Sequence, residues 1–164
     1  MDLIDAGLDE DQLLALRDAY QRETMIGVLS KGMPGIDART TQYIGDIRQA
    51  FFDNDSPMKP QDRERCLIAV LAARDAGFNL AIHIYIGLME GLTPQEIADV
   101  IFLGGVYTGV DRISDGLGAL VKTLATLKNL SDGDMCTPNC TVDEVLKALR
   151  VAFVYPGGTW NVRQ

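Results

Sequence analysis

Residues 62–91, DRERCLIAVLAARDAGFNLAIHIYIGLMEG, decide the fold. Two long apolar runs follow one another here, and neither alternates apolar with polar residues as a half-buried β-strand would. Each run is apolar on nearly every face, which is typical of a helix buried on all sides. The stretch therefore predicts a hairpin of two buried helices, over about 61–76 and 79–90. Gly77 is expected to end the first helix in a left-handed conformation, and Gly91 to end the second.

The rest of the chain adds further helices and almost no strand signal. Thr93-Pro94-Gln95-Glu96 and Thr141-Val142-Asp143-Glu144 are capping boxes, each of which marks the start of a helix. Further helices are predicted over about 10–29, 38–52, 94–107 and 112–129, and from the second capping box to about 153. The predicted fold class is all-α, a multi-helix bundle.

The chain of 164 residues is long enough for one domain with a full hydrophobic core, so 1–164 is treated as a single domain. The segment DNDSPMKP, residues 53–60, reads as a linker because it combines turn residues with two prolines. It divides an N-terminal helical extension (1–55) from the main core (56–130). A C-terminal helix and tail follow (131–164).

Two features of the later helices concern packing. Gly104 and Gly105 lie near the end of one helix, where each glycine costs roughly 1 kcal/mol relative to alanine, so close helix packing or substrate access is expected. Ile113, Leu117, Leu120, Leu124 and Leu127 recur at alternating four- and three-residue steps. That spacing suits a helix–helix seam, either within one chain or between subunits.

Composition narrows the classes of partner. The net charge of −8 and the pI near 4.5 argue against nucleic acids and anionic membranes, which are bound through basic patches. The N-terminus has no basic and apolar leader segment, and no apolar stretch is long enough to span a membrane. We therefore expect a cytoplasmic protein with its three cysteines as reduced thiols.

His83 is the only histidine in the chain and lies on an apolar helix. A lone histidine in that position is most often a core residue whose ring nitrogens are satisfied locally. No second histidine and no compact cysteine cluster accompany it, so no metal site is expected. The functional alternative is a proton donor or acceptor, because imidazole titrates near neutral pH.

Glu64 lies at the polar start of the preceding helix, with Leu67, Ile68 and Leu71 on the same face. That face turns a carboxyl toward the core, which suits general acid–base work. The alternative is a solvated carboxylate near the helix N-terminus, or one paired with a neighbouring cation. In a straight hairpin that turns at Gly77, Glu64 and His83 lie about 10 Å apart along the axis, so spacing alone does not join them.

The cysteines give weak signals. Cys66 is expected to be a small hydrophobic residue of a buried helix. Cys136 and Cys140 form a C-x3-C loop, one residue longer than the redox C-x-x-C motif. A strained or regulatory disulfide in that loop is the alternative to two thiols.

Residues 60–127 resemble the carboxymuconolactone decarboxylase-like superfamily, which includes the alkyl hydroperoxide reductase D-type proteins. The resemblance is carried by Arg63-Glu64 at the start of an apolar helix, by His83 in the next, and by the pattern H-x7-G-[LV]-T-x-x-E-[IV] followed by Y-x-G at Tyr107 to Gly109. The redox branch of that superfamily places a C-x-x-C between its glutamate and its histidine. Here Ala76 and Asn79 occupy the cysteine positions, so the resemblance favours the branch without those cysteines.

The resemblance implies loss of CO2 from an unsaturated carboxylated lactone, a lyase reaction with no metal or organic cofactor. It implies Glu64 and His83 as catalytic residues, with Arg63, Tyr107 or Arg112 as anchors for an acidic substrate. It also implies a homo-oligomer, a trimer or a hexamer, for which the Ile113–Leu127 seam offers a surface. The alternatives are an antioxidant alkylhydroperoxidase-like protein and a non-catalytic, ligand-binding oligomer with the same fold.

Overall fold

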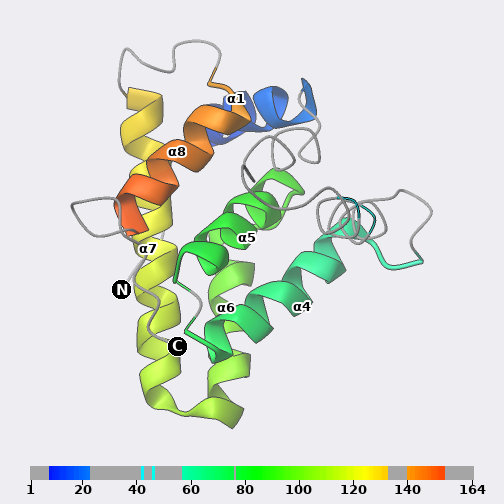
Figure 1. The fold of residues 1–164 in the computed structure, drawn as a ribbon, viewed down its shortest axis with the longest axis vertical. Helices are drawn as coiled ribbons and strands as arrows, with labels where there is room; N and C mark the ends of the chain where they lie inside the picture. The colour runs from blue at the N-terminus through cyan, green and yellow to red at the C-terminus, as the bar shows by residue number, and fades with distance from the viewer. Residues whose placement is uncertain are drawn as a thin grey trace.

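The structure is a computed structural model, and it describes residues 8–22, 42, 46, 57–75, 77–132 and 140–153. The described residues form α-helices and no β-strand, which confirms the all-α class. The helices are α1 (Glu10–Arg22), α4 (Pro60–Ala73), α5 (Gly77–Met89), α6 (Pro94–Thr108), α7 (Val110–Asp132) and α8 (Val142–Phe153) (Figure 1). None of these helices is long and apolar enough to cross a membrane.

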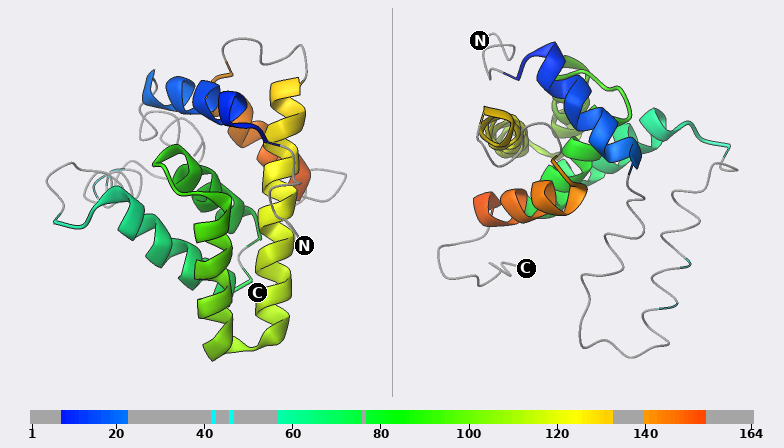
Figure 2. Two further views of the ribbon diagram at one scale, coloured as in Figure 1. Left: turned by 180° about the vertical axis from the view of Figure 1, so that it is seen from behind. Right: turned by 90° about the horizontal axis from the view of Figure 1, so that it is seen from above.

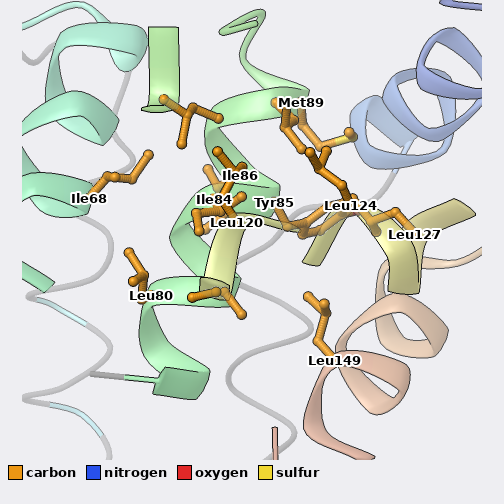
Figure 3. Packing of buried hydrophobic residues seen from close by; sticks show 14 of the residues in the cluster. Ile68, Leu80, Ile84, Tyr85, Ile86, Met89, Leu120, Leu124, Leu127 and Leu149 are labelled. Atoms are coloured by element: carbon orange, nitrogen blue, oxygen red, sulfur yellow. The ribbon is translucent and has the colours of Figure 1, made fainter. Parts of the chain in front are cut away.

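Helix α5 is the centre of the fold. It packs against α1, α4, α6, α7 and α8, so its apolar side chains are covered from nearly every direction. Ile84, Tyr85 and Ile86 are each no more than 1% exposed, and they meet leucines of α7 and α8 in one continuous core (Figure 3). The all-round apolar composition of this helix is therefore explained by its position.

The starts of α6 and α8 are fixed by local side chains, as the sequence indicates. The Oγ1 of Thr93 accepts a hydrogen bond from the backbone N–H of Glu96, and the Glu96 carboxylate accepts one from the N–H of Thr93. Thr141 and Glu144 make the same reciprocal pair at the start of α8. Both capping boxes are confirmed.

The connection between α4 and α5 differs from the expected one. α4 ends at Ala73 rather than near residue 76, and Gly77 is the first residue of α5. The residue with a positive φ at this end is Asp75, at 55°, since a short aspartate side chain tolerates the left-handed region. Gly91 does end α5 with a positive φ of 101°, as predicted.

Helices α6 and α7 run antiparallel and meet at a short corner at Gly109, at the opposite end of the molecule from α1 (Figures 1 and 2). Gly105 allows this close approach, because an added Cβ would overlap the side chain of Ile113. Close helix packing is thus the reason for that glycine.

The leucine seam of α7 lies within the chain. Leu120, Leu124 and Leu127 are buried in the core that α7 forms with α5 and α8. Of the two expected alternatives, these three leucines form a seam within one chain, so they are not free to join subunits. A seam pattern in sequence cannot say which partner covers it, and here the neighbouring helices do.

The outer face of α4 was expected to be buried and is not. Cys66 and Val70, one turn apart, are both exposed. The opposite face of α4 packs on α5 and α6, so only part of its apolar circumference is covered in one chain. Of the expected helix over 38–52 only residues 42 and 46 are described, and both are helical. The end of the expected helix over 10–29 lies outside the described residues, as does Cys136.

Candidate functional site

Glu64 and His83 form a hydrogen-bonded pair between α4 and α5. The Oε2 of Glu64 lies 2.8 Å from the Nδ1 of His83. The Glu64 side chain is fully buried, whereas the His83 side chain is 22% exposed. A buried carboxylate therefore holds one ring nitrogen, and the partly exposed ring keeps its Nε2 for other contacts.

The position of the turn explains how the two side chains meet. Because α4 ends at Ala73 and α5 begins at Gly77, the hairpin turns between them, about two residues earlier than expected. Counted from that turn, the axial offset between Glu64 and His83 is about 4.5 Å rather than about 10 Å. Two side chains of this length span the remaining offset directly.

Gly87 brings the two helices close at this point. An ideal Cβ on Gly87 would lie 3.8 Å from the Cβ of Glu64 and 3.2 Å from the Cδ1 of Ile68. Gly87 lies one turn after His83, on the same side of α5. The absence of a side chain there lets α4 pack against α5 where the pair forms.

Glu64 has a second, less satisfied contact. Its Oε1 lies 3.9 Å from the Nε of Arg63, which is beyond hydrogen-bond distance. Among the described residues this oxygen is buried without a hydrogen-bond donor. Arg65, by contrast, turns outward and pairs with Asp62 and Glu96. The pair therefore has one unsatisfied acceptor in a buried setting, which costs free energy unless a ligand or water supplies a donor.

Two further polar residues adjoin the pair. The hydroxyl of Tyr20, in α1, donates to the Oε1 of Glu90 at 3.3 Å, and the Tyr20 ring meets the Tyr85 ring edge-on at 6.0 Å. Burial raises the pKa of Glu90, and the charge of Glu64 raises it further. We name Tyr20, Arg63, Glu64, His83 and Glu90 the polar site.

Tyr20 and Glu90 are not among the site residues predicted from the sequence. Glu90, directly after α5, follows His83 by seven residues, about two helical turns, so it continues the same face, and this spacing is a signal that was available. Tyr20 has no such local signal, because its contact depends on how α1 packs on α5.

The structure does not bring Tyr107 and Arg112 to the polar site within one chain. Tyr107 is 91% exposed on the last turn of α6. Arg112 pairs with Asp75 and Asp115 at 3.3 and 3.8 Å. Asp75 follows Glu64 by eleven residues along α4, which corresponds to about 16 Å. Arg63 is the predicted anchor that lies beside the pair.

The cysteines differ from the expectation. Cys66 is a free thiol but is exposed. Cys140, at the start of α8, is disulfide-bonded, so the expectation that all the cysteines are reduced thiols is wrong for this residue. Cys140 is also buried, and its side chain packs with the core.

The polar site is separate from a groove between α7 and α8, and the described residues form no cluster of metal ligands. Within the described ranges, no three His, Cys, Asp or Glu side chains are grouped as metal ligands. A groove of about 500 Å³ lies between α7 and α8, and Leu130, Ala148 and Val151 contribute to its apolar lining. The groove contains none of the residues of the polar site. The polar site is the stronger candidate because it holds the hydrogen-bonded glutamate–histidine pair.

The fold and the site thus define an all-helical protein with a buried glutamate–histidine pair at a helical hairpin. Residues 35–122, which are more than half of the chain, match the carboxymuconolactone decarboxylase family, and the protein belongs to that family. No curated protein and no solved structure matches the chain significantly.

Family membership does not choose between branches. The family includes decarboxylases and peroxidases. The chain carries three cysteines, so it is not cysteine-free as a whole, although the two motif positions hold Ala76 and Asn79. Membership of the family therefore fixes neither the activity nor the substrate of this protein.

Proposed function

We propose that the protein is a cofactor-independent, decarboxylase-like lyase that acts on a small carboxylated lactone or a related small acid. The observation that carries the proposal is the 2.8 Å hydrogen bond between a fully buried carboxylate and a partly exposed imidazole. A histidine satisfied separately in the core would favour a non-catalytic protein. A shared, partly accessible pair favours proton transfer.

The proposed reaction needs one proton at a defined carbon. The bond between carbon and the carboxylate breaks, CO2 leaves, and the electron pair moves into a conjugated carbonyl of the lactone. The carbanion equivalent then takes a proton from Nε2 of the His83 imidazolium. Glu64, as a carboxylate that accepts from Nδ1–H, stabilises the imidazolium and fixes the ring orientation.

Arg63 is the proposed anchor for the substrate carboxylate, because it lies beside Glu64 and is only 7% exposed. A guanidinium binds a carboxylate through parallel hydrogen bonds. Partial exclusion of water around the site strengthens that interaction. Tyr107 and Arg112 lie at the other end of α4 and α6, so Arg63 is the better supported anchor.

The test compares His83→Ala and Glu64→Gln with the matched surface variant Glu10→Gln, by following CO2 release from a series of carboxylated lactones. We expect both site variants to lose activity by about 10²- to 10⁴-fold, since general acid–base groups contribute that much. Glu10 is exposed, so its variant should keep wild-type turnover. Equal turnover in all three variants would refute the roles of Glu64 and His83.

The antioxidant alternative is separated by a peroxide-consumption assay. Cys66 is the free thiol among the described residues. Its side chain lies on the exposed face of α4, whereas that of Glu64 is buried. Peroxide consumption that disappears in Cys66→Ser would favour the peroxidase reading over the lyase.

We also propose that the protein is a homo-oligomer, a trimer or a hexamer, joined through an apolar surface at the α6–α7 corner. We name this surface the corner patch; its exposed residues are Phe102, Leu103, Val106, Tyr107 and Val110. Contiguous exposed apolar side chains of this size are typical of protein interfaces.

A further inference from the structure

Helix α1 is anchored on the last turn of α5, beside the polar site. The Nε of Arg17 donates to the backbone carbonyl of Leu88 at 2.9 Å, and Tyr20 donates to the Glu90 side chain. Leu16 and Ala19, which directly precede these two residues in α1, are buried in the core. Polar contacts and apolar packing thus hold α1 at the end of α5 that carries Glu90.

Glu90 is in turn close to Glu64. The Nε2 of Gln61, one turn before Glu64 on α4, donates to the backbone carbonyl of Glu90 at 2.8 Å. Gly87, one turn before Glu90 on α5, packs against Glu64. Gln61, which contacts Glu90, is one turn from Glu64, and Gly87, which packs against Glu64, is one turn from Glu90. The two carboxylates therefore lie in one polar region.

We propose that α1 completes the active site, and that Tyr20 is a positioning residue that holds Glu90 so that its carboxylate charge acts on the Glu64–His83 pair. The proposal rests on the proposed function of that pair. Helix α1 lies outside the residues that match the family, 35–122, so this part of the site is an addition to the matched domain.

The charges around Glu90 set the direction of the effect. The described side chains that act on it are Tyr20 from α1, and Arg63 and Glu64 from α4. Burial raises the pKa of the Glu90 carboxyl most, the Tyr20 hydrogen bond opposes this, Glu64 raises it, and Arg63 lowers it. Burial and the two carboxylates also raise the pKa of Tyr20, so its hydroxyl stays protonated and acts as a donor.

The loss of the Tyr20 hydroxyl therefore has a defined consequence. Tyr20→Phe keeps the ring against Tyr85 but removes the hydrogen bond that stabilises the ionised form of Glu90. The pKa of Glu90 should rise, and the site should lose a negative charge at a higher pH than in the wild type.

The experiment is NMR titration of the full chain labelled with ¹³C at glutamate side-chain carboxyls and ¹⁵N at histidine. The Glu90 signal is the one that Glu90→Gln removes, and the ring signals belong to His83, the sole histidine. We expect Tyr20→Phe to move the Glu90 midpoint to higher pH. We also expect the His83 signals to follow the Glu90 titration in the wild type and in Glu10→Gln, and to lose that response in Glu90→Gln.

A Glu90 midpoint that is the same in the wild type and in Tyr20→Phe would overturn the proposal. His83 ring signals that do not change over the pH range in which Glu90 titrates would also overturn the proposal. A merely structural role of Tyr20 would lower the melting temperature without moving the midpoint. The outcome is independent of turnover, so failure of this linkage is distinguishable from failure of the proposed lyase activity, which the His83→Ala assay tests.

Discussion

The two ends of the helical bundle depart from the usual distribution of side chains in opposite ways. At the end where α1 meets α5, the polar site buries a glutamate and holds an arginine, a histidine and a second glutamate around it. At the α6–α7 corner, the corner patch exposes five large apolar side chains. Buried polar groups and exposed apolar patches are the informative exceptions to hydrophobic burial.

The difference teaches which end does which task. A buried, incompletely satisfied carboxylate costs stability, which supports the proposed chemistry at the polar site. An exposed apolar patch costs solubility, which supports the proposed subunit interface at the corner. The two proposed functions lie at opposite ends of the bundle, so variants at one end should leave the other intact.

The largest effect is expected at the corner patch. The double variant Leu103→Glu/Val106→Glu places two charges where the proposed subunits meet, and should convert the oligomer to a monomer in analytical ultracentrifugation. Both side chains are more than half exposed in one chain, so the fold should change by less than about 0.5 kcal/mol. A wild-type protein that is already monomeric would contradict the proposed interface.

The next effect concerns the helix contact below that corner. Gly105→Ala forces a Cβ into the Ile113 side chain, so we expect it to destabilise the fold by about 1–3 kcal/mol in denaturant unfolding. Gly118→Ala, in α7, is the matched control. Its added Cβ would meet nothing within 4 Å, so it should stabilise the helix by about 0.5–1 kcal/mol. Equal effects of the two substitutions would contradict the packing described at Gly105.

A smaller effect is expected at the start of α6, on the path between the two ends. Thr93→Ala removes the hydroxyl that accepts from the N–H of Glu96, and should cost about 1 kcal/mol in the free energy of unfolding. Thr126→Ala, a half-buried threonine inside α7 whose hydroxyl donates to the carbonyl of Lys122, serves as the comparison. If both cost the same, the capping box contributes nothing of its own.

The smallest effect is a pH dependence at the polar site. The pKa of Glu90 is raised in the folded protein, so the folded state holds its proton more tightly than the unfolded state. Stability should therefore fall as pH rises from the unfolded value, about 4.3, through the raised folded value. Glu90→Gln should flatten this part of the stability curve in urea titrations, and a wild-type curve that rises there would contradict the assignment.

The sequence predicts the frame of this molecule well, because its signals are local. Two apolar runs give α4 and α5, and paired threonine and glutamate residues give the starts of α6 and α8. It predicts less about what covers each face. An apolar run does not show that Cys66 faces outward, and the leucines of α7 do not show which helix covers them.

The candidate site is predicted in part for the same reason. Glu64 and His83 follow from the face of a helix and from a motif, but their contact depends on where the hairpin turns, at Asp75 rather than Gly77. The pairing of Tyr20 with Glu90 joins residues seventy positions apart. No spacing rule reaches that far, because the packing of α1 on α5 decides it.

The central claim is that Glu64 and His83 act as one acid–base pair. His83 is the only histidine, so the ¹⁵N signals of its ring identify the protonated nitrogen without further assignment. The account predicts a proton on Nδ1, shifted downfield by its hydrogen bond to the carboxylate, and a clear change of both ring signals in Glu64→Gln. Ring signals that are identical in the wild type and in Glu64→Gln would contradict it.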